Sequence, residues 1–325
     1  MRKAHHNNGR YLNPWLKETR ASYWGLIKWK LLSRNRFKEE RKRPFSFKVE
    51  TPDFTSLDRS GSDYIVWLGH STVLIKAGSK TIITDPVFWD VNFLIRRKAP
   101  FPIDPERLPR IDICLISHGH YDHLNTRSVA FLKERHNPLF ITGPGYEEYF
   151  RPLGPIRHVP LDWNEEYSIE GVRIRSLPCQ HWTKRTLFDT NRMLWCSFLI
   201  ESKGKKYYWI GDTGYYEGFR SIGSRHGPVD VLIVPIGAYE PRWFMKGAHV
   251  NPEEALLIAR DVSARLVIPA HWGTFDITDE PLWMPPERLR EVHDPSKDPL
   301  VKILNHGGSL VVGEDAQRFG CAGKG

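Results

Sequence analysis

The chain has 325 residues, of which 40% are hydrophobic and 12% aromatic, and its formal net charge is +9. This length supports a sizeable core in one large domain or two small ones. Composition argues against a membrane-spanning helix, because no run of about 18 apolar residues occurs, and against a disulfide framework, because the four cysteines show no CxxC spacing. Because no disulfide framework is expected, a reducing, cytoplasmic setting fits best. The first residues are basic but lack the apolar stretch of a secretory signal.

The positive charge is concentrated near the beginning of the chain. Residues 1–50 carry 14 Lys and Arg against 4 Asp and Glu, whereas the rest is close to neutral. We expect residues 1–60 to form a basic, aromatic arm. Within it, Tyr23, Ile27 and Leu31 share one helical face flanked by basic residues, which is typical of a segment on an anionic membrane surface. The alternative is that the aromatic face packs on the body of the protein. Contact with nucleic acid is a weaker third alternative.

From residue 64 onward, short apolar runs alternate with turns and amphipathic stretches. Three runs rich in β-branched and aromatic residues predict a β-meander over 64–68, 72–78 and 80–84. The continuous apolar run at 111–117 predicts a strand buried on both faces, and residues 125–136 have helical spacing. Five more strands are predicted at 172–178, 194–201, 205–212, 230–237 and 265–271.

Two helices are predicted in the last part of the chain. In the clearer one, at 251–262, Asn251 is the cap, a proline occupies the first position and acidic residues fill the first turn. Residues 285–292 give a weaker helix. Because strands dominate both halves, with helices between them, we predict two sheets packed face to face with helices outside, in one catalytic domain over 61–315. Residues 316–325 would form a C-terminal tail.

The stretch SHGHYDHL, residues 117–124, places four metal-binding side chains within six positions: His118, His120, Asp122 and His123. His118 and His120 are two residues apart, so they point the same way in an extended stretch. Asp122 and His123 come after a turn and can face a second metal ion. Such crowding is rare by chance and predicts a metal site.

Three further candidate ligands, His181, Asp212 and His271, each follow a predicted strand. Strand ends can converge on one edge of a sheet, where loops carry function on a rigid base. Taken alone, each of these residues would more often be structural or part of a turn, but the cluster at 118–123 changes that interpretation. Three histidines would hold one metal, and an aspartate with two histidines the other, with Asp212 bridging. This donor set favours zinc over iron or manganese.

At these residues the sequence resembles a known family. SHGHYDHL matches the HxHxDH signature of the metallo-β-lactamase superfamily, and residues 68–88, with His70 and Asp85, resemble the opening strands of that fold. The stretch GDTGY around Asp212 resembles its bridging-aspartate motif. The resemblance implies an α/β (α+β) fold, a four-layer αββα sandwich with a dinuclear site at one edge.

Longer stretches, in order over roughly residues 60–293, resemble the N-acyl-phosphatidylethanolamine phospholipase D family: PCQHWTKRTLFDTN, GDTGYYEGF, PIGAYEPRWFM, HVNPEEA and HWGTFDITDEP. The resemblance implies two zinc ions, one held by His118, His120 and His181, the other by Asp122, His123 and His271, with Asp212 between them. It also implies that Tyr121 and His249 face the substrate phosphate and that Lys184 lies near the lipid entrance. Two positions depart from the family pattern: Gly119 stands where Asn occurs, and Asn251 where Asp is usual.

The expected reaction uses a hydroxide that bridges two zinc ions and attacks phosphorus in line with the leaving alkoxide. Asp122, Asp212 and His249 are the candidate catalytic residues. The general acid stays open between a metal-bound water and His249, which could instead orient the loop before the helix. His70 and Asp85 fit better as hydrogen-bonding partners of the ligands than as ligands. The aromatic stretch at 239–245 could line an acyl-chain channel or pack in the core.

The leading interpretation is a zinc-dependent phosphodiesterase that hydrolyses N-acyl-phosphatidylethanolamine-type phospholipids with phospholipase D-type cleavage. A lactonase or other ester hydrolase of the same superfamily is the alternative, since attack on a carbonyl carbon needs much the same metals. A nuclease is disfavoured because the body of the chain is near neutral, and a non-catalytic binding protein because the ligand set is complete. The expected partners are a phospholipid substrate and the anionic inner face of a membrane, without nucleic acid; a homodimer stays open.

Overall fold

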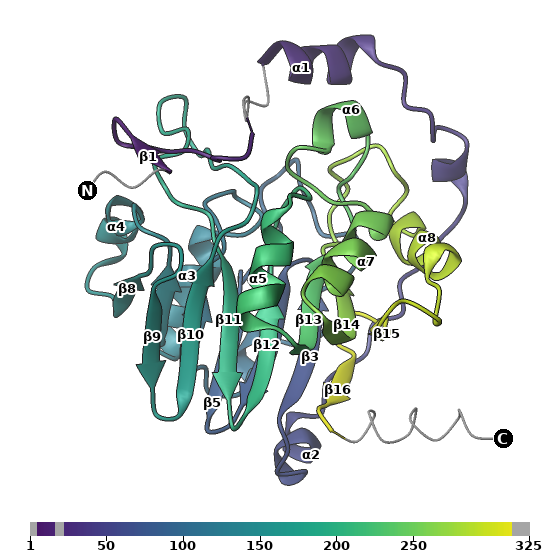
Figure 1. Ribbon diagram of the computed structural model, residues 1–325. Coiled ribbons are helices and arrows are strands. Elements are labelled where there is room, and N and C mark those ends of the chain that lie inside the picture. The colour runs from purple at the N-terminus through teal and green to yellow at the C-terminus, as the bar shows by residue number, and fades with distance from the viewer. Residues whose placement is uncertain (1–4, 17–22, 314–325) are drawn as a thin grey trace, which may run out of the picture.

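The computed structural model describes residues 5–16 and 23–313. Two seven-stranded sheets lie face to face, and helices cover their outer faces (Figure 1). The four-layer αββα sandwich predicted from the sequence is confirmed. The predicted tail, residues 316–325, lies outside the described residues. No helix in the described ranges is long and apolar enough to cross a membrane.

The first sheet begins with the predicted meander: β3, β4 and β5 pair antiparallel, and β5 continues in parallel to β6, β7 and β8. The apolar run at 111–117 forms a strand of only three residues, which is buried on both faces as predicted. In spatial order the strands are β16 (Ser309–Val311), β3 (Tyr64–Gly69), β4 (Thr72–Ala77), β5 (Lys80–Thr84), β6 (Ile113–Leu115), β7 (Leu139–Thr142) and β8 (His158–Pro160).

The second sheet contains the five strands predicted at 172–271. Its strands pair antiparallel from β9 to β12 and parallel from β12 to β15. In spatial order they are β15 (Leu300–Val301), β14 (Ala264–Ala270), β13 (Val229–Pro235), β12 (Lys205–Trp209), β11 (Ser197–Ser202), β10 (Val172–Leu177) and β9 (Glu166–Ile169).

Successive side chains of a strand face opposite sides of its sheet, and this alternation explains the layers. In β3, Ile65 and Trp67 face the core between the sheets, whereas Tyr64 and Val66 face the helices on the other side. The first sheet packs against α2 (Phe54–Arg59), α3 (Thr126–Arg135) and α4 (Glu147–Phe150), and the second against α5 (Gly218–His226), α7 (Pro252–Asp261) and α8 (Met284–Val292). Short 3-10 turns lie at η3 (Pro105–Arg107) and η4 (Arg151–Leu153).

The helix predicted at 251–262 is α7, and its N-terminus has the predicted cap. The Asn251 side chain accepts a hydrogen bond from the Glu254 N–H, and the Glu254 carboxylate accepts one from the Asn251 N–H. This capping box satisfies two backbone donors at once. An Asp at position 251 would offer the same acceptor oxygen, so the departure from the family pattern preserves the cap.

Before α2, which packs on the first sheet, the N-terminal arm contains β1 (His6–Asn7), β2 (Arg10–Tyr11), α1 (Tyr23–Ile27), the π-helical η1 (Lys28–Leu32) and η2 (Glu40–Lys42). From α1 it passes over α6 (Arg242–Met245), at the top of Figure 1. Trp29 is buried against Ala238 and Met245, and its indole donates to Asp279 over 2.9 Å. The arm therefore packs on the body through Trp29.

Other apolar side chains of the arm point away from the body. Trp24, Leu31 and Leu32 are 76–79% exposed. The Tyr23 side chain of the predicted helical face lies outside the described residues. The packing expectation therefore holds for Trp29, and contact of the exposed face with a membrane stays a prediction.

Strand direction brings the functional loops together. β3 and β5 run the same way because each is antiparallel to β4, and β6 is parallel to β5. β10 and β12 run the same way because each is antiparallel to β11. β14 also runs this way, because it is parallel to β13 and β13 is parallel to β12. The carboxyl ends of these strands lie at the upper edge in Figure 1, here called the carboxyl edge; the opposite edge is the amino edge.

Candidate metal centre

The predicted ligands all lie in loops of the carboxyl edge. The loop after β6 carries four of them, and one follows each of β10, β12 and β14. The structure brings all seven together as two adjoining sets: His118, His120, Asp122, His123, His181, Asp212 and His271. Most are buried, and only His120 and Asp122 are partly exposed.

The first set consists of His118, His120 and His181, whose ligand nitrogens all lie within 4.8 Å of one another. His181 Nε2 is 3.2 Å from His120 Nδ1. The other nitrogen of His181, Nδ1, donates to the Ala248 carbonyl over 3.0 Å, which fixes the ring with Nε2 turned inward. His118 Nδ1 lies 2.9 Å from Ser117 Oγ, so its Nε2 likewise faces the set.

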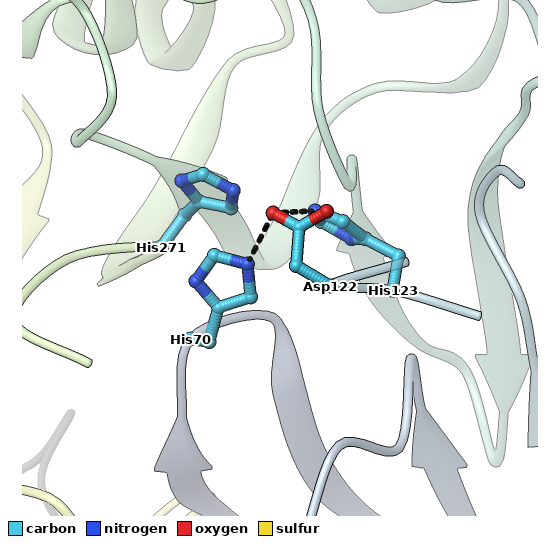
Figure 2. Close-up of side chains that lie close together, drawn as sticks. All are labelled: His70, Asp122, His123 and His271. Carbon is cyan, nitrogen blue, oxygen red and sulfur yellow. Dashed lines mark hydrogen bonds and ion pairs between the residues drawn. The ribbon is translucent and has the colours of Figure 1, made fainter. Parts of the chain in front are cut away.

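The second set consists of Asp122, His123 and His271, together with His70 from the turn between β3 and β4 (Figure 2). Asp122 Oδ2 lies 3.2 Å from His70 Nε2 and 3.8 Å from His123 Nε2. His70 was predicted to support the ligands. The structure places its Nε2 among the candidate ligand atoms and directly against the Asp122 carboxylate.

Asp212 lies between the two sets. Its Oδ2 is 3.2 Å from His123 Nε2 and 3.9 Å from both His118 Nε2 and His181 Nε2, and its Oδ1 is 3.0 Å from His271 Nε2. Burial alone would raise the pKa of this carboxyl, but the surrounding histidines, His123 first, hold the pKa well below its ordinary range. Asp212 is therefore an anion in contact with both sets.

Asp85 supports His123 from behind. Its Oδ2 lies 2.6 Å from His123 Nδ1, and it also accepts the Ser117 hydroxyl over 2.5 Å and the Ser117 N–H, through Oδ1, over 2.7 Å. A carboxylate on the outer nitrogen of a histidine fixes the ring and strengthens its inner nitrogen as a donor to metal. The position agrees with the supporting role predicted for Asp85.

Three residues of the centre have left-handed backbone conformations that L side chains rarely adopt. They are His70 at φ +52°, Asp85 at φ +31° and His271 at φ +60°. Each such residue costs on the order of 1–3 kcal/mol, and such strain clusters at functional sites. The surrounding contacts hold these side chains in place against that cost.

The buried polar atoms of the centre fit a divalent metal ion. Among the described residues, His118 Nε2, His120 Nε2, His123 Nε2, His271 Nε2 and Asp212 Oδ1 make no hydrogen bond, although the Asp212 carboxylate lies within ion-pair distance of His123 and His271. A buried polar atom left in this state costs about 1–3 kcal/mol. Imidazole and carboxylate donors that face one another without thiolate are the ligands of a first-row divalent metal, so a bound cation would satisfy the whole group.

His249 borders both sets from the loop before α7. Its Nδ1 is 3.7 Å from Asp212 Oδ2, and its ring centroid is 5.3 Å from that of His181. Burial lowers the pKa of His249 to about 3, so the ring is neutral and carries one N–H. Its backbone carbonyl accepts a hydrogen bond from Arg242 over 2.8 Å, so the residue also orients its loop.

Tyr121 lies on the outside of the ligand loop. Its side chain is half exposed, and its hydroxyl donates to the Arg185 carbonyl over 2.8 Å, away from the histidine and aspartate cluster. Lys184 is half-buried on the neighbouring loop, 182–192. Neither side chain belongs to the two sets.

Arg185 is a residue that sequence reasoning missed. Its guanidinium donates to the carbonyls of Gly119 and Leu124, over 2.9 and 2.8 Å, and lies over the Tyr121 ring at 4.1 Å. It therefore ties loop 182–192 to both ends of the ligand loop. No spacing in the sequence signals this contact, because its partners are backbone carbonyls more than 60 positions away.

The structure also accounts for Gly119. A Cβ at this position would lie 2.7 Å from Met193 Sδ, so the Met193 side chain fills the space that a larger residue would need. The backbone of Gly119 is not in the left-handed region, and packing alone opposes a side chain here.

The aromatic stretch at 239–245 mostly packs beneath the arm. Tyr239 and Met245 are buried, and Phe244 packs against Trp29 with ring centroids 5.3 Å apart. Trp243 is half exposed, with Lys28 Nζ 5.2 Å from its ring centroid. The packing alternative therefore holds for three of these side chains, and Trp243 stays at the surface.

Comparison with known proteins agrees with the geometry. A beta-lactamase superfamily domain matches residues 80–272. A Caenorhabditis elegans protein named N-acyl-phosphatidylethanolamine-hydrolyzing phospholipase D 1 is 36% identical over 260 residues, which cover 72% of this chain and 71% of that protein. An uncharacterised protein of Mycobacterium tuberculosis is 34% identical over 281 residues, covering 83% of this chain and 73% of the relative.

Solved structures share the fold. An isothiocyanate hydrolase from Delia radicum gut bacteria aligns with a TM-score of 0.62 at 16% identity, over 77% of this chain and 99% of that one. The metallo hydrolase Igni18 from Ignicoccus hospitalis gives 0.60 at 19% identity, over 77% and 97%. At these identities the likeness concerns the fold alone. The family match and the relatives above 30% identity show that this chain belongs to the metallo-β-lactamase superfamily, as a hydrolase with a histidine and aspartate centre that can bind divalent metal.

Proposed function

We propose that this hydrolase is a zinc-dependent phosphodiesterase that cleaves N-acyl-phosphatidylethanolamine-type phospholipids in the phospholipase D manner. The observation that carries the proposal is the position of Asp212, whose two carboxylate oxygens contact histidines of both sets. A shared carboxylate suits a pair of metal ions, the arrangement that clamps the attacking and leaving oxygens of a phosphodiester. Similarity over 260 residues to a relative named for this activity supports the substrate class.

The proposed metal content is two zinc ions per chain. His118, His120 and His181 would hold one ion, and Asp122, His123 and His271 the other, with Asp212 between them. When bound, zinc supplies Lewis acidity and activates water near neutral pH. His70, in contact with Asp122, and Asp85, in contact with His123, would keep those two ligands aimed at the second ion.

The protein's own groups would hold the phosphodiester and manage its protons. Asp122 and Asp212 remain carboxylates, because neighbouring histidines lower both pKa values although burial opposes this. Neutral His249 has one N–H to donate, either to a phosphoryl oxygen or to the departing alkoxide. These three are the proposed catalytic residues.

Loop residues would meet the substrate outside the centre. Tyr121 would contact the phosphate once its hydroxyl exchanges the Arg185 carbonyl for a phosphoryl oxygen. The Lys184 ammonium would attract the same anionic group near the lipid entrance. The proposed partner is a phospholipid bilayer, approached from the cytoplasmic side by a peripherally bound enzyme and assisted by the basic arm.

Product analysis tests the proposal. The purified chain, with its metal content measured, is incubated with vesicles of N-acyl-phosphatidylethanolamine, and lipids are identified by mass spectrometry. Equal amounts of phosphatidic acid and N-acylethanolamine are expected, with loss of activity on chelation and recovery with zinc. A zinc-loaded chain that leaves this lipid intact but opens a lactone would instead establish the ester hydrolase alternative.

A further inference from the structure

The most exposed apolar side chains of the protein are concentrated on three segments. Among the described residues, seven large apolar side chains are 71–79% exposed, and the next, Trp243, is 52% exposed. Single exposed apolar residues are ordinary, but adjacent pairs repeated on separate segments mark an interaction surface. The seven are Trp24, Leu31 and Leu32 on α1 and η1, Phe93 and Leu94 after β5, and Leu187 and Phe188 after β10.

All three segments belong to the carboxyl edge. The loops at 86–99 and 182–192 follow strands that end there, and α1 and η1 are anchored above α6 by Trp29. None of the seven lies in the tight turns of the amino edge. The exposed apolar groups and the metal centre thus share one edge of the sandwich.

Contacts connect the two loops around the ligand loop. The Arg127 guanidinium lies 3.9 Å from the Trp89 ring centroid in the first loop. Its neighbour Thr126 accepts the Tyr149 hydroxyl over 3.0 Å, and the Tyr149 ring lies 4.8 Å from the Arg185 guanidinium of the second loop. Arg185 holds the ligand loop as described above. The two apolar pairs therefore lie on loops that both connect to the segments around the ligand loop.

The tip of the loop at 86–99 is held outward by its own hydrogen bonds. Asn92 Oδ1 accepts the N–H groups of Leu94 and Ile95, each over 2.9 Å. At the base, the Arg97 guanidinium donates to the carbonyls of Val87 and Ala99. Phe93 and Leu94 thus project from a turn with a fixed base, and their exposure follows from that turn.

The tip of the loop at 182–192 is built in the same way. Asp189 Oδ1 accepts the N–H groups of Arg185 and Thr186, over 3.0 and 2.8 Å. From the arm, Arg10 donates to the Phe188 carbonyl over 3.2 Å. Leu187 and Phe188 project from this second turn as a matching apolar pair.

The charge around the two loop tips and the arm indicates which kind of partner would bind them. Loops 86–99 and 182–192 each contain three basic residues and one acidic residue, and residues 28–43 contain eight basic and two acidic ones. In the two loops Arg97 and Arg185 donate to backbone carbonyls, whereas Arg96, Lys98 and Arg192 are exposed. Basic side chains that surround apolar tips complement anionic lipid headgroups. The same charge on a second copy of the chain would repel it.

We propose that the Phe93–Leu94 tip, the Leu187–Phe188 tip and the open face of α1 and η1 insert together into an anionic phospholipid bilayer and seat the metal centre against it. The choice of a bilayer rests on the proposed function. Insertion would place the scissile phosphate of a lipid at the entrance while its acyl chains stay in the membrane.

The experiment measures vesicle binding without turnover. The full chain is sedimented with phosphatidylcholine vesicles that contain or lack phosphatidylglycerol. The variants are the serine pairs Phe93→Ser with Leu94→Ser, Leu187→Ser with Phe188→Ser, and Leu31→Ser with Leu32→Ser. Leu300→Ser, on edge strand β15 away from the carboxyl edge, is the matched control.

Each serine pair is expected to lower partitioning onto anionic vesicles at least about tenfold, because two large apolar groups no longer leave water. The control should bind like the wild type. Thermal melting should be unchanged, and so should hydrolysis of detergent-dispersed N-acyl-phosphatidylethanolamine, since the tips do not touch the centre.

Loop pairs that bind vesicles like the wild type would overturn the inference, even if the lipid is hydrolysed. Serine pairs that instead turn a dimer into a monomer, without changing vesicle binding, would also overturn it and make this face a self-association interface. Loss of vesicle binding in a chain that hydrolyses no N-acyl-phosphatidylethanolamine would support the docking surface while removing the proposed substrate.

Discussion

Left-handed backbone conformations occur at both edges of the sandwich, but in different surroundings. At the amino edge, Glu170 and Lys203 adopt left-handed φ values of +44° and +47° in tight hairpin turns, each followed by a glycine. Both residues are exposed, and Glu170 pairs with Lys80 over 2.7 Å. At the carboxyl edge, His70, Asp85 and His271 adopt this conformation while buried.

The two edges are stabilised in different ways, the amino edge by neighbouring residues and the carboxyl edge by contacts between distant segments. The amino-edge turns are stable because two adjacent residues suit a hairpin. The carboxyl edge combines strained backbone with buried polar atoms that make no hydrogen bond, and contacts between distant segments hold it together. The strained backbone and the buried polar atoms therefore lower the stability of the fold at the edge where we expect metal and substrate to bind.

The largest expected effect comes from substituting an acid at the carboxyl edge. Asp122→Asn should lower turnover of N-acyl-phosphatidylethanolamine by on the order of a thousandfold, because the loss of metal charge stabilisation is worth several kcal/mol. The matched control is Asp230→Asn at the amino edge, where the carboxylate contacts Arg265 and the Lys206 N–H. Steady-state rates with equal activity in Asp122→Asn and wild type would refute the proposed ligand role.

A second effect concerns stability against pH. Burial raises the pKa of Glu280 to about 7, although its oxygens accept the Tyr239 and Glu240 N–H groups. Between pH about 4.5 and 7 the unfolded chain releases this proton while the folded chain keeps it, so stability falls as pH rises, by roughly 3 kcal/mol in all. Glu280→Gln should flatten this part of the profile in denaturant titrations. An unchanged slope would show that another group dominates.

Asp85→Asn tests the support behind the centre. Loss of the charged contact to His123 should weaken metal binding about 10- to 100-fold, as measured by competition with a chromogenic chelator. Asp63→Asn is the matched control, since Asp63 is a buried amino-edge carboxylate that accepts the Gly78 N–H and the Tyr207 hydroxyl. It should lower stability and leave metal affinity unchanged. Equal loss of metal affinity in Asp85→Asn and Asp63→Asn would show that the effect on metal binding is not specific to the carboxyl edge.

The smallest expected effect concerns Gly119. Gly119→Asn places a side chain against Met193 Sδ and should destabilise the fold by about 1 kcal/mol, near the lower end for overpacking, because a methionine side chain can move. Adding Met193→Ala should recover most of the loss in thermal melts. Destabilisation that persists in the double variant would point to a cause other than this contact.

Much of the fold follows from local patterns. The meander, the strands before His181, Asp212 and His271, and the capped helix at Asn251 depend on neighbouring residues, so periodicity and capping signals predict them. The ligand candidates could be predicted for the same reason, because each follows a strand.

What the sequence did not reveal depends on contacts between distant positions. Trp29 meets Asp279 across 250 positions, and Arg185 meets the Gly119 carbonyl across 66. His70 was predicted as a supporting residue, yet its contact with Asp122 across 52 positions was not. The paired apolar tips also went unnoticed, because only the folded chain shows that Phe93 and Phe188 stay exposed at one edge.

We propose that the carboxyl edge directs water to the phosphorus of a membrane phospholipid. The most direct test is hydrolysis of N-acyl-phosphatidylethanolamine vesicles by the zinc-loaded chain in ¹⁸O-labelled water, with both products analysed by mass spectrometry. One ¹⁸O atom is expected in phosphatidic acid, none in the N-acylethanolamine, and no product after chelation. Label in the N-acylethanolamine, or undiminished product without metal, would contradict it.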